Sequence, residues 1–157
     1  MQPLDIPGFG TLAIENLILD FNGTLALDGR LIDGVSGRIE TLSRSMNLHV
    51  LTADTHGFVE KEMCGCPCKV EIVPPGVRED QAKLAFIKRL GAETCAAVGN
   101  GAIDAPMLEA ARLGICVVGT EGAAGISIMA ADLVVTGPLD ALDLLIKPER
   151  LIAGLRR

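Results

Sequence analysis

The sequence predicts an α/β protein in which a mainly parallel sheet lies between two layers of helices. Short runs of aliphatic residues recur along the chain, and segments with helical spacing lie between most of them. The runs are continuous rather than alternating, which is typical of strands covered on both faces. Of the 157 residues, 49% are apolar and only 22% are charged, which is enough apolar surface for a full core. We therefore expect one three-layer domain over residues 1–157.

Six apolar runs are the expected strands of this sheet. They span residues 17–20, 49–52, 69–73, 95–99, 115–119 and 132–135. The clearest helical pattern covers residues 78–90, where four residues follow the i, i+3, i+4, i+7 spacing, namely Lys83, Phe86, Ile87 and Leu90. Helices are also expected to begin near Pro138 and Pro148, because proline is favoured in the first turn.

Two short hairpins are predicted outside the core of the sheet. Residues 11–14 precede Glu15 and Asn16 and then the first core strand, which suggests an antiparallel hairpin at its entrance. Asp28-Gly29 is a typical two-residue hairpin turn inside "LALDGRLIDG", and it predicts a small flap just after the first core strand.

The composition argues against several classes of partner. A net charge of −6 and the absence of Trp and Tyr disfavour binding to nucleic acid, which depends on clustered basic residues and stacking side chains. No apolar run approaches the length of a membrane helix, and the first ten residues resemble no signal peptide. We expect a cytoplasmic protein with no membrane or nucleic-acid partner.

The five cysteines predict free thiols rather than a disulfide framework, because their number is odd and nothing indicates secretion. Cys64, Cys66 and Cys68 form "CGCPC" and would share one face of an extended segment, so a thiolate metal site is an open alternative there. Cys95 and Cys116 lie in apolar runs and are expected to be small buried hydrophobes.

Polar residues at the ends of the expected strands mark the candidate site. Asp20 ends the first run, Thr52 ends the second, and Gly99-Asn100-Gly101 follows the fourth and leads to Asp104. In a parallel α/β sheet, ligands bind beyond the carboxyl ends of the strands. These residues are therefore expected to meet at one edge of the sheet.

The residue types at this edge are suited to phosphoryl transfer. A carboxylate such as Asp20 can attack phosphorus and form an aspartyl-phosphate. The reaction needs Mg²⁺, for which Asp20 and Asp104 can supply carboxylates. Gly23 lets the backbone approach a phosphate and Thr24 adds a hydroxyl.

Further phosphate ligands are expected from the second strand end and from the helix at 78–90. Thr52 offers a hydroxyl, and the neighbouring backbone, at Ala53, offers an amide. Lys83 shares the apolar stripe of its helix, so its ammonium points into the protein and needs an anion as partner. A bound phosphate would be such a partner.

Each of these signals has a plainer interpretation when it is taken alone. Asn-Gly in "DFNGT" is a strong turn signal, a helical lysine is usually solvated, and "GNG" is usually a loop. Their occurrence in a fixed order at strand ends or on the apolar stripe favours a phosphate site.

In these residues the chain resembles the haloacid dehalogenase (HAD) superfamily, whose fold is Rossmann-like. "DFNGT" is similar to the first motif of that family, with Asp20 as the nucleophile. Thr52 and Lys83 match the second and third motifs, and "GNGAID" matches the fourth. Within the superfamily, "AAVGNGAIDAPMLEAARLGICV" resembles the phosphorylation domain of P-type ATPases, and the chain looks like a stand-alone soluble relative of it.

The resemblance implies a hydrolase that acts on a small phosphorylated substrate or nucleotide. It assigns Asp20, Asn22, Asn100 and Asp104 to the Mg²⁺ site, Asn22 through its backbone carbonyl. The intervals between the motifs are too short for a cap domain. The capless sugar-phosphate phosphatases of the family, which are tetramers, are an alternative relative, and a homo-oligomer is conceivable for this chain as well.

Two residues depart from the motifs of the family. Asn22 replaces the acid that donates and accepts protons in most family phosphatases, and Asn100 replaces an acid that binds Mg²⁺. An amide cannot transfer the proton, so we expect the transfer of a phosphoryl group to Asp20 to outrun its hydrolysis. A degenerate protein that only binds phosphate, metal or a partner is the second alternative.

Overall fold

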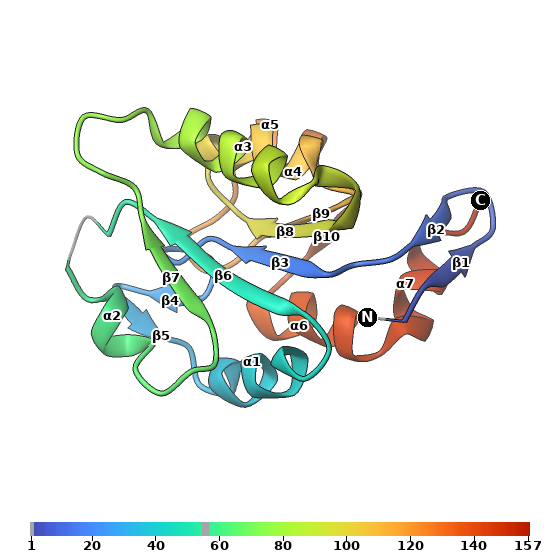
Figure 1. Cartoon of the computed structure of the whole chain (residues 1–157), viewed down its shortest axis with the longest axis horizontal. Coiled ribbons are helices and arrows are strands. Elements are labelled where there is room, and N and C mark those ends of the chain that lie inside the picture. The colour runs from blue at the N-terminus through green and yellow to red at the C-terminus, as the bar shows by residue number, and fades with distance from the viewer. Residues whose placement is uncertain (1, 55–56) are drawn as a thin grey trace.

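The computed structural model describes residues 2–54 and 57–157, and within them a parallel sheet has the strand order β10-β9-β8-β3-β6-β7 (Figure 1). β3 (Asn16–Leu19) lies at the centre and pairs with β6 (Asn47–Thr52) on one side and β8 (Cys95–Gly99) on the other. The outer strands are β7 (Lys69–Ile72), β9 (Leu113–Val117) and β10 (Leu133–Val135). The chain proceeds outward from β3 first through β6 and β7 and then through β8, β9 and β10. The strand order therefore reverses between β3 and β8, where ligands bind in sheets of this kind.

Helices cover both faces of the sheet, as the three-layer prediction requires (Figure 1). One face carries α3 (Glu79–Leu90), α4 (Ala105–Ala110) and α5 (Gly125–Ala130). The other carries α1 (Val35–Ser43), α6 (Pro138–Ile146) and α7 (Pro148–Leu155). The short helix α2 (Val59–Glu62) precedes β7, and the 3₁₀ turns η1 (Ala92–Thr94) and η2 (Ala102–Asp104) flank β8.

Two apolar clusters fill the space between the sheet and its helices. Ile18 of β3 packs in one cluster with Phe86 and Ile87 of α3, while its neighbours Leu17 and Leu19 belong to the other cluster. Successive side chains of a strand point to opposite faces, so a strand buried on both faces needs apolar residues at every position. Cys95 and Cys116 are buried in the α3 cluster, which confirms them as small core residues.

The expected flap is present as the hairpin of β4 (Ala26–Leu27) and β5 (Arg30–Leu31). Its turn residues Asp28 and Gly29 have φ angles of 51° and 76°. Positive φ at both central positions is the requirement of the turn that Asp-Gly favours. The flap follows directly on the loop that carries Asp20.

The expected hairpin between residues 11–14 and the first core strand is wrong. β2 (Gly10–Leu12) pairs instead with β1 (Leu4–Ile6), with Leu4 opposite Leu12. β3 has no free edge because β6 and β8 occupy both of its sides. The N-terminal hairpin lies beside α7 and the C-terminus, away from the carboxyl ends of the strands (Figure 1).

The structure does not assemble the thiolate metal site considered for "CGCPC". Within residues 2–54 and 57–157, no group of three or more His, Cys, Asp or Glu side chains is placed to hold a metal ion. Burial raises the pKa of the Cys66 thiol, and it raises that of Cys68 to about 11. The protonated thiol is therefore favoured over the thiolate that a metal needs. Across the same residues, no helix has the length and apolarity to cross a membrane.

His49 is a buried polar residue on the α3 face of β6. Its side chain meets the ring of Phe86 edge to face, with 5.2 Å between the ring centroids. Among the described residues, its buried Nδ1 has no hydrogen-bond partner. Burial, together with the positive charges of Lys69 and Arg89, lowers the pKa of His49 below its ordinary value of 6.5.

This lowered pKa predicts an acid-linked loss of stability. The unfolded chain takes up a proton near the ordinary pKa, whereas the folded protein takes it up only at lower pH. Relative to a His49→Leu variant, the free energy of unfolding of the wild type should fall as the pH is lowered from about 7 to about 5. Urea unfolding at a series of pH values with a chelator measures this difference, and parallel curves for the two proteins would contradict it.

Candidate active site

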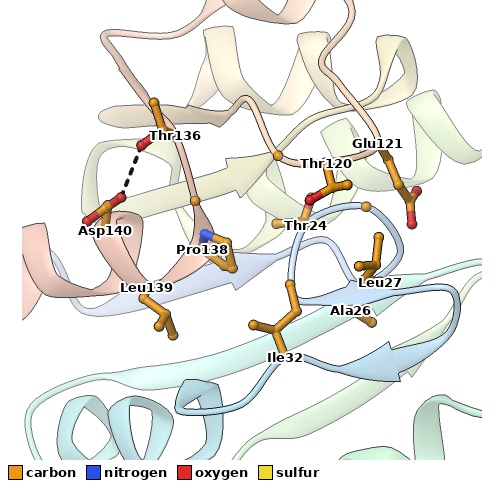
Figure 2. A pocket seen from close by; sticks show the side chains of 13 residues that line it. Thr24, Ala26, Leu27, Ile32, Thr120, Glu121, Thr136, Pro138, Leu139 and Asp140 are labelled. Atoms are coloured by element: carbon orange, nitrogen blue, oxygen red, sulfur yellow. Dashed lines mark hydrogen bonds between the residues drawn. The ribbon is translucent and has the colours of Figure 1, made fainter.

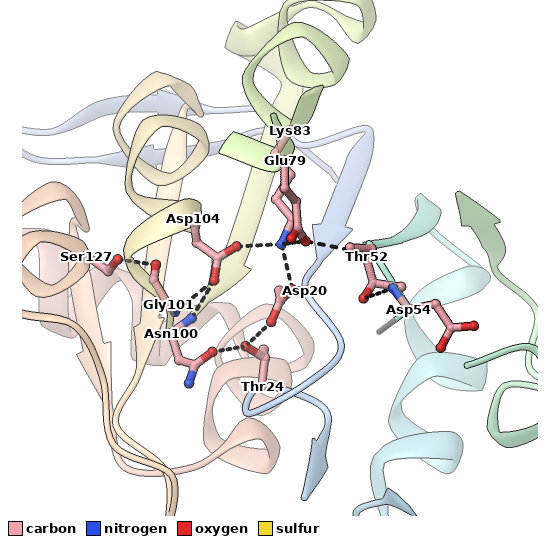
Figure 3. A network of polar contacts seen from close by, with 11 residues as sticks. Asp20, Thr24, Thr52, Asp54, Glu79, Lys83, Asn100, Gly101, Asp104 and Ser127 are labelled. Carbon is pink, nitrogen blue, oxygen red and sulfur yellow. Dashed lines mark hydrogen bonds and ion pairs between the residues drawn. The ribbon is translucent and has the colours of Figure 1, made fainter. Parts of the chain in front are cut away.

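The carboxyl ends of β3, β6 and β8 bring the predicted site residues together (Figure 3). Asp20 directly follows β3, Thr52 is the last residue of β6, and Asn100 directly follows β8. All three reach the edge of the sheet at the point where the strand order reverses. The expectation that these strand ends meet, with Lys83 and Asp104 beside them, agrees with the geometry.

The Lys83 ammonium is the centre of the site. The side chain comes from the middle of α3 and is fully buried, with 0% of it exposed. Its Nζ lies 2.6 Å from Asp20 Oδ1, 2.8 Å from Asp104 Oδ1 and 3.1 Å from Glu79 Oε1. The apolar stripe of α3 turned this lysine inward, and the carboxylates supply the anions that its burial requires.

Three carboxylates around one ammonium leave the site with excess negative charge. Burial, followed by the negative charge of Asp104, raises the pKa of Asp20 from 3.8 to about 7, although Lys83 opposes the shift. Burial by itself would lower the pKa of Lys83, but the attraction of Asp20 and Asp104 outweighs it and raises that pKa above the ordinary value. Lys83 therefore stays charged, while Asp20 needs further positive charge to be ionised fully at neutral pH.

Both carboxylate oxygens of Asp104 are engaged. Oδ1 accepts from Lys83, and Oδ2 accepts from the backbone N–H groups of Asn100 and Gly101 at 3.0 and 2.9 Å. The turn carrying these amides packs so closely that a Cβ on Gly99 would lie 2.6 Å from the Asp104 side chain. Glycine is therefore required at position 99, and Asp104 is held in one orientation.

Thr24 connects the loop after β3 to the turn after β8. Its Oγ1 lies 3.0 Å from Asp20 Oδ2 and 3.1 Å from Asn100 Oδ1 (Figure 3). The orientation of the Asn100 amide is defined, because its Nδ2 donates to the carbonyl of Gly122 at 3.1 Å. One hydroxyl has a single proton, so it can donate to only one of the two oxygens at a time.

Gly23 has no room for a side chain. Its φ is +74°, and an added Cβ would lie 2.5 Å from Asn100 Nδ2 and 3.0 Å from Glu121 Oε2. The glycine of "DFNGT" thus allows the loop to pass close to Asn100, in addition to forming the expected turn.

Glu79 is a site residue that the sequence reasoning missed. Its Oε1 accepts from the backbone N–H of Ala53 at 3.2 Å and forms an ion pair with Lys83 Nζ at 3.1 Å. Thr52 is 2% exposed, and its hydroxyl accepts from the N–H of Asp54 at 3.1 Å. Glu79 lies four residues before Lys83 on α3, and that i, i+4 spacing was the one signal that could have identified it.

A pocket of about 130 Å³ opens above these groups. Acidic, amide and hydroxyl side chains line it, including Asp20, Asn22, Thr52, Glu79 and Asn100. It contains both positions at which an amide stands where the resembled motifs have an acid. The pocket has room for a phosphoryl group but not for the rest of a larger substrate.

A second cavity, of about 410 Å³, lies on the other side of the loop after β3 (Figure 2). Gly23 and Thr24 line it together with the flap and the segments after β9 and β10. Figure 2 shows Glu121 and Asp140 at opposite sides of this cavity. The flap is tied across it, because the N–H of Asp28 donates to Glu121 Oε1 at 3.2 Å.

The donor set fits Mg²⁺, which prefers oxygen ligands and keeps several waters. Asp20 Oδ2 and Asn100 Oδ1 both approach Thr24 Oγ1, so two oxygens converge beside the pocket and share the single proton of that hydroxyl when Asp20 is ionised. The excess negative charge at Asp20 favours a cation there as well. The resemblance predicts Asp104 in the Mg²⁺ site as well, but both of its oxygens already accept hydrogen bonds, and in this geometry it orients the turn that holds Asn100.

The sequence is similar to those of two proteins of Methanocaldococcus jannaschii. It is 44% identical over 82 residues to the uncharacterized protein MJ0073 of Methanocaldococcus jannaschii, a match that spans 50% of this chain and 88% of that protein. It is 41% identical over 39 residues to MJ0072 of the same organism, which spans 25% of this chain and 89% of that protein. No family model matches the sequence.

Solved structures identify the fold. The 3-deoxy-D-manno-octulosonate 8-phosphate phosphatase of Moraxella catarrhalis, solved with magnesium, phosphate and KDO, aligns with a TM-score of 0.71. This alignment covers 89% of this chain and 90% of that one at 15% identity. The cobalt-bound deoxy-D-mannose-octulosonate 8-phosphate phosphatase of Haemophilus influenzae gives a TM-score of 0.70, 16% identity and coverage of 89% and 91%. The predicted three-layer, capless HAD fold is therefore confirmed.

The raised pKa of Asp20 predicts that the metal-free site costs stability at neutral pH. The folded protein holds a proton on Asp20 up to pH 7 or so, whereas the unfolded chain loses it near the ordinary value of 3.8. Stability from this group is therefore present at low pH and is lost as the pH rises from about 4 to about 7.

An Asp20→Asn variant lacks this dependence, so its advantage over the wild type should grow with rising pH. Thermal unfolding with a chelator from about pH 5 to about pH 8 measures the difference in melting temperature. A difference that stays constant with pH, or shrinks as the pH rises, would contradict the assignment.

Proposed function

The chain belongs to the same family as the uncharacterized protein MJ0073. From its HAD-phosphatase fold and the geometry of its site, we propose that it is a Mg²⁺-dependent phosphohydrolase that uses Asp20 as nucleophile. The observation that carries the proposal is the contact of Asp20 Oδ1 with the buried Lys83 ammonium at 2.6 Å, at the switch point of the sheet. A structural ion pair alone would not require a polar pocket above it, and Asp20 of this pair lines one.

The residues of the pocket can perform the first half of the reaction. Asp20 attacks phosphorus, a bond forms between its carboxylate oxygen and the phosphorus, and the bond to the leaving oxygen breaks. Lys83, the Ala53 amide and the Thr52 hydroxyl would be the donors to the phosphoryl oxygens. Bound Mg²⁺ would neutralise charge on those oxygens, with Asp20, Asn100 and the Asn22 carbonyl as its protein ligands.

The proton transfers in both halves of the reaction lack their usual acid and base. Water must attack the phosphorus, free Asp20 and lose a proton, and the leaving group of the first step must gain one. Asn22 can neither donate nor accept these protons at neutral pH. General acid–base catalysis contributes about 10² to 10⁴ in rate, so the aspartyl-phosphate should be long-lived.

A small sugar phosphate or a similar metabolite is the substrate class we favour. The solved relatives with this fold include phosphatases of a phosphorylated sugar acid, which supports the capless sugar-phosphate alternative over the P-type-ATPase resemblance. The pocket of about 130 Å³ accepts the phosphoryl group, so the remainder of the substrate must extend beyond it. The resemblance to P-type ATPases stays a prediction.

A second candidate function, a protein that binds phosphate or metal without turnover, is favoured by Asn22 and Asn100. Each replaces a carboxylate of the resembled motifs, which removes negative charge from the site and weakens its attraction for Mg²⁺. Calorimetry with Mg²⁺ separates the candidates. Micromolar to low-millimolar Mg²⁺ binding that is lost in Asp20→Ala and accompanies turnover supports the enzyme, whereas binding of phosphate or metal without turnover in a parallel assay supports the second candidate.

The enzyme is expected to accumulate a phosphoryl adduct on Asp20. Incubation with acetyl phosphate or p-nitrophenyl phosphate and Mg²⁺, followed by intact-mass measurement, should show the addition of one phosphoryl group. The adduct should be absent in Asp20→Asn, which has no nucleophilic carboxylate. No adduct and no turnover across a series of divalent metals would refute the proposed function.

An Asn22→Asp variant should hydrolyse the adduct faster. Restoring a carboxylate two residues after the nucleophile supplies a general base, so single-turnover dephosphorylation should accelerate by roughly 10² or more. Gln2→Glu, at an exposed position near the N-terminus, is the matched control for the change from an amide to a carboxylate. Equal rates of adduct decay in the two variants would show that Asn22 does not limit hydrolysis.

A further inference from the structure

Glu79 occupies the donors that a phosphoryl group would use. A single oxygen, Oε1, accepts from the Ala53 N–H at 3.2 Å and lies 3.1 Å from Lys83 Nζ. Figure 3 shows the Glu79 side chain beside that of Lys83, near Thr52. The second strand end and the buried lysine are thus already bridged by an anion that belongs to the protein.

Charge prevents Glu79 and a phosphoryl group from sharing these donors. Asp20, Asp104 and Glu79 already surround one ammonium. A phosphate dianion placed against Lys83 would stand next to the Glu79 carboxylate, and like charges at such distances repel strongly in a buried site. Binding of phosphate at these donors therefore requires Glu79 to leave them.

The position of Glu79 on α3 allows this exchange. Glu79 is the first residue of the helix, and its side chain is 21% exposed, in contrast to the fully buried Lys83. Rotation of the side chain toward solvent leaves the helix and the Lys83 contacts to Asp20 and Asp104 intact. Asp104, by contrast, is held by the backbone amides of the turn after β8 and cannot move in this way.

We propose that Glu79 is the resident anion of the phosphate site, which bridges Lys83 and the Ala53 amide until a phosphoryl group displaces it. The inference rests on the proposed function for its choice of ligand. Glu79 then lowers the affinity of the site for free phosphate, since each binding event must break its two contacts. It also competes for the same donors when the phosphate product leaves, and so favours release.

The test is the binding of inorganic phosphate to the full chain, measured by calorimetry with and without Mg²⁺. Glu79→Gln keeps the shape of the side chain but removes its charge, and Glu79→Ala removes the competing oxygen. Contacts of charged groups of this kind correspond to changes of roughly ten- to hundredfold in affinity, so phosphate should bind at least about tenfold more tightly to both variants. Inhibition of any turnover by phosphate should strengthen in parallel.

Asp80→Asn is the matched control, because it removes the same charge from the next residue of the helix. Asp80 pairs with Arg78 at 2.6 Å, outside the pocket. The phosphate affinity of the Asp80→Asn variant should stay within about twofold of the wild type, since exposed ion pairs of this kind contribute little free energy. An equal gain in Asp80→Asn and Glu79→Gln would reduce the effect to net charge and overturn the proposal.

The outcomes distinguish this inference from the proposed function. Tighter phosphate binding in the Glu79 variants of a protein that forms no adduct and turns over no substrate supports the resident anion and refutes the enzyme. Turnover through Asp20 with unchanged phosphate affinity in the Glu79 variants supports the enzyme and refutes the resident anion. Phosphate binding in neither the wild type nor the variants also refutes the resident anion, because removal of Glu79 would then expose no phosphate site.

Discussion

The buried Lys83 ammonium is the interaction on which the site depends. It joins three segments that are distant in the sequence, because its partners are Asp20 after β3, Asp104 in the turn after β8, and Glu79 on its own helix. A fully buried charge without partners would be very costly, and so would the carboxylates without the lysine. The fold is therefore arranged so that α3 points one long side chain between the carboxyl ends of β3 and β8.

The same cluster explains why the site calls for ligands. One ammonium does not neutralise three carboxylates, so the cluster carries excess negative charge. Burial, and after it the negative charge of Asp104, raises the pKa of Asp20. A cation near Asp20 Oδ2 and Asn100 Oδ1 would relieve it from one side, and departure of Glu79 would relieve it from the other. Asparagine at positions 22 and 100 lowers the excess, since carboxylates there would add two further negative charges to the same pocket. The two asparagines therefore reduce the electrostatic repulsion in the metal-free fold, and they also weaken the attraction of the site for Mg²⁺.

The parts of the fold and site that follow local rules could be predicted from the sequence. Continuous apolar runs predicted the strands, and the apolar stripe on residues 78–90 correctly predicted that Lys83 points inward. The pairing of β1 with β2 could not be predicted, because it follows from the pairing of β6 and β8 with the two edges of β3, which leaves β2 no edge of β3 to pair with. Glu79 was missed for a similar reason: its second contact, the Ala53 amide, is supplied by the end of a different strand. Long-range contacts of single polar groups leave no periodic trace in the sequence.

The substitution at position 22 is not compensated by the other acids of the pocket. Asp104 has both oxygens bound by Lys83 and by two backbone amides, so it can neither rotate toward a water molecule nor accept a proton without losing those bonds. In the proposed reaction, Asp20 is itself the attacking group. Glu79 contacts the Ala53 amide and Lys83, and its side chain is the most exposed of the three, at 21% against 7% for Asp20 and 1% for Asp104. In the proposed reaction, the fixed geometry that holds Asp20 beside Lys83 thus leaves proton transfer as the step for which this site has the fewest groups available.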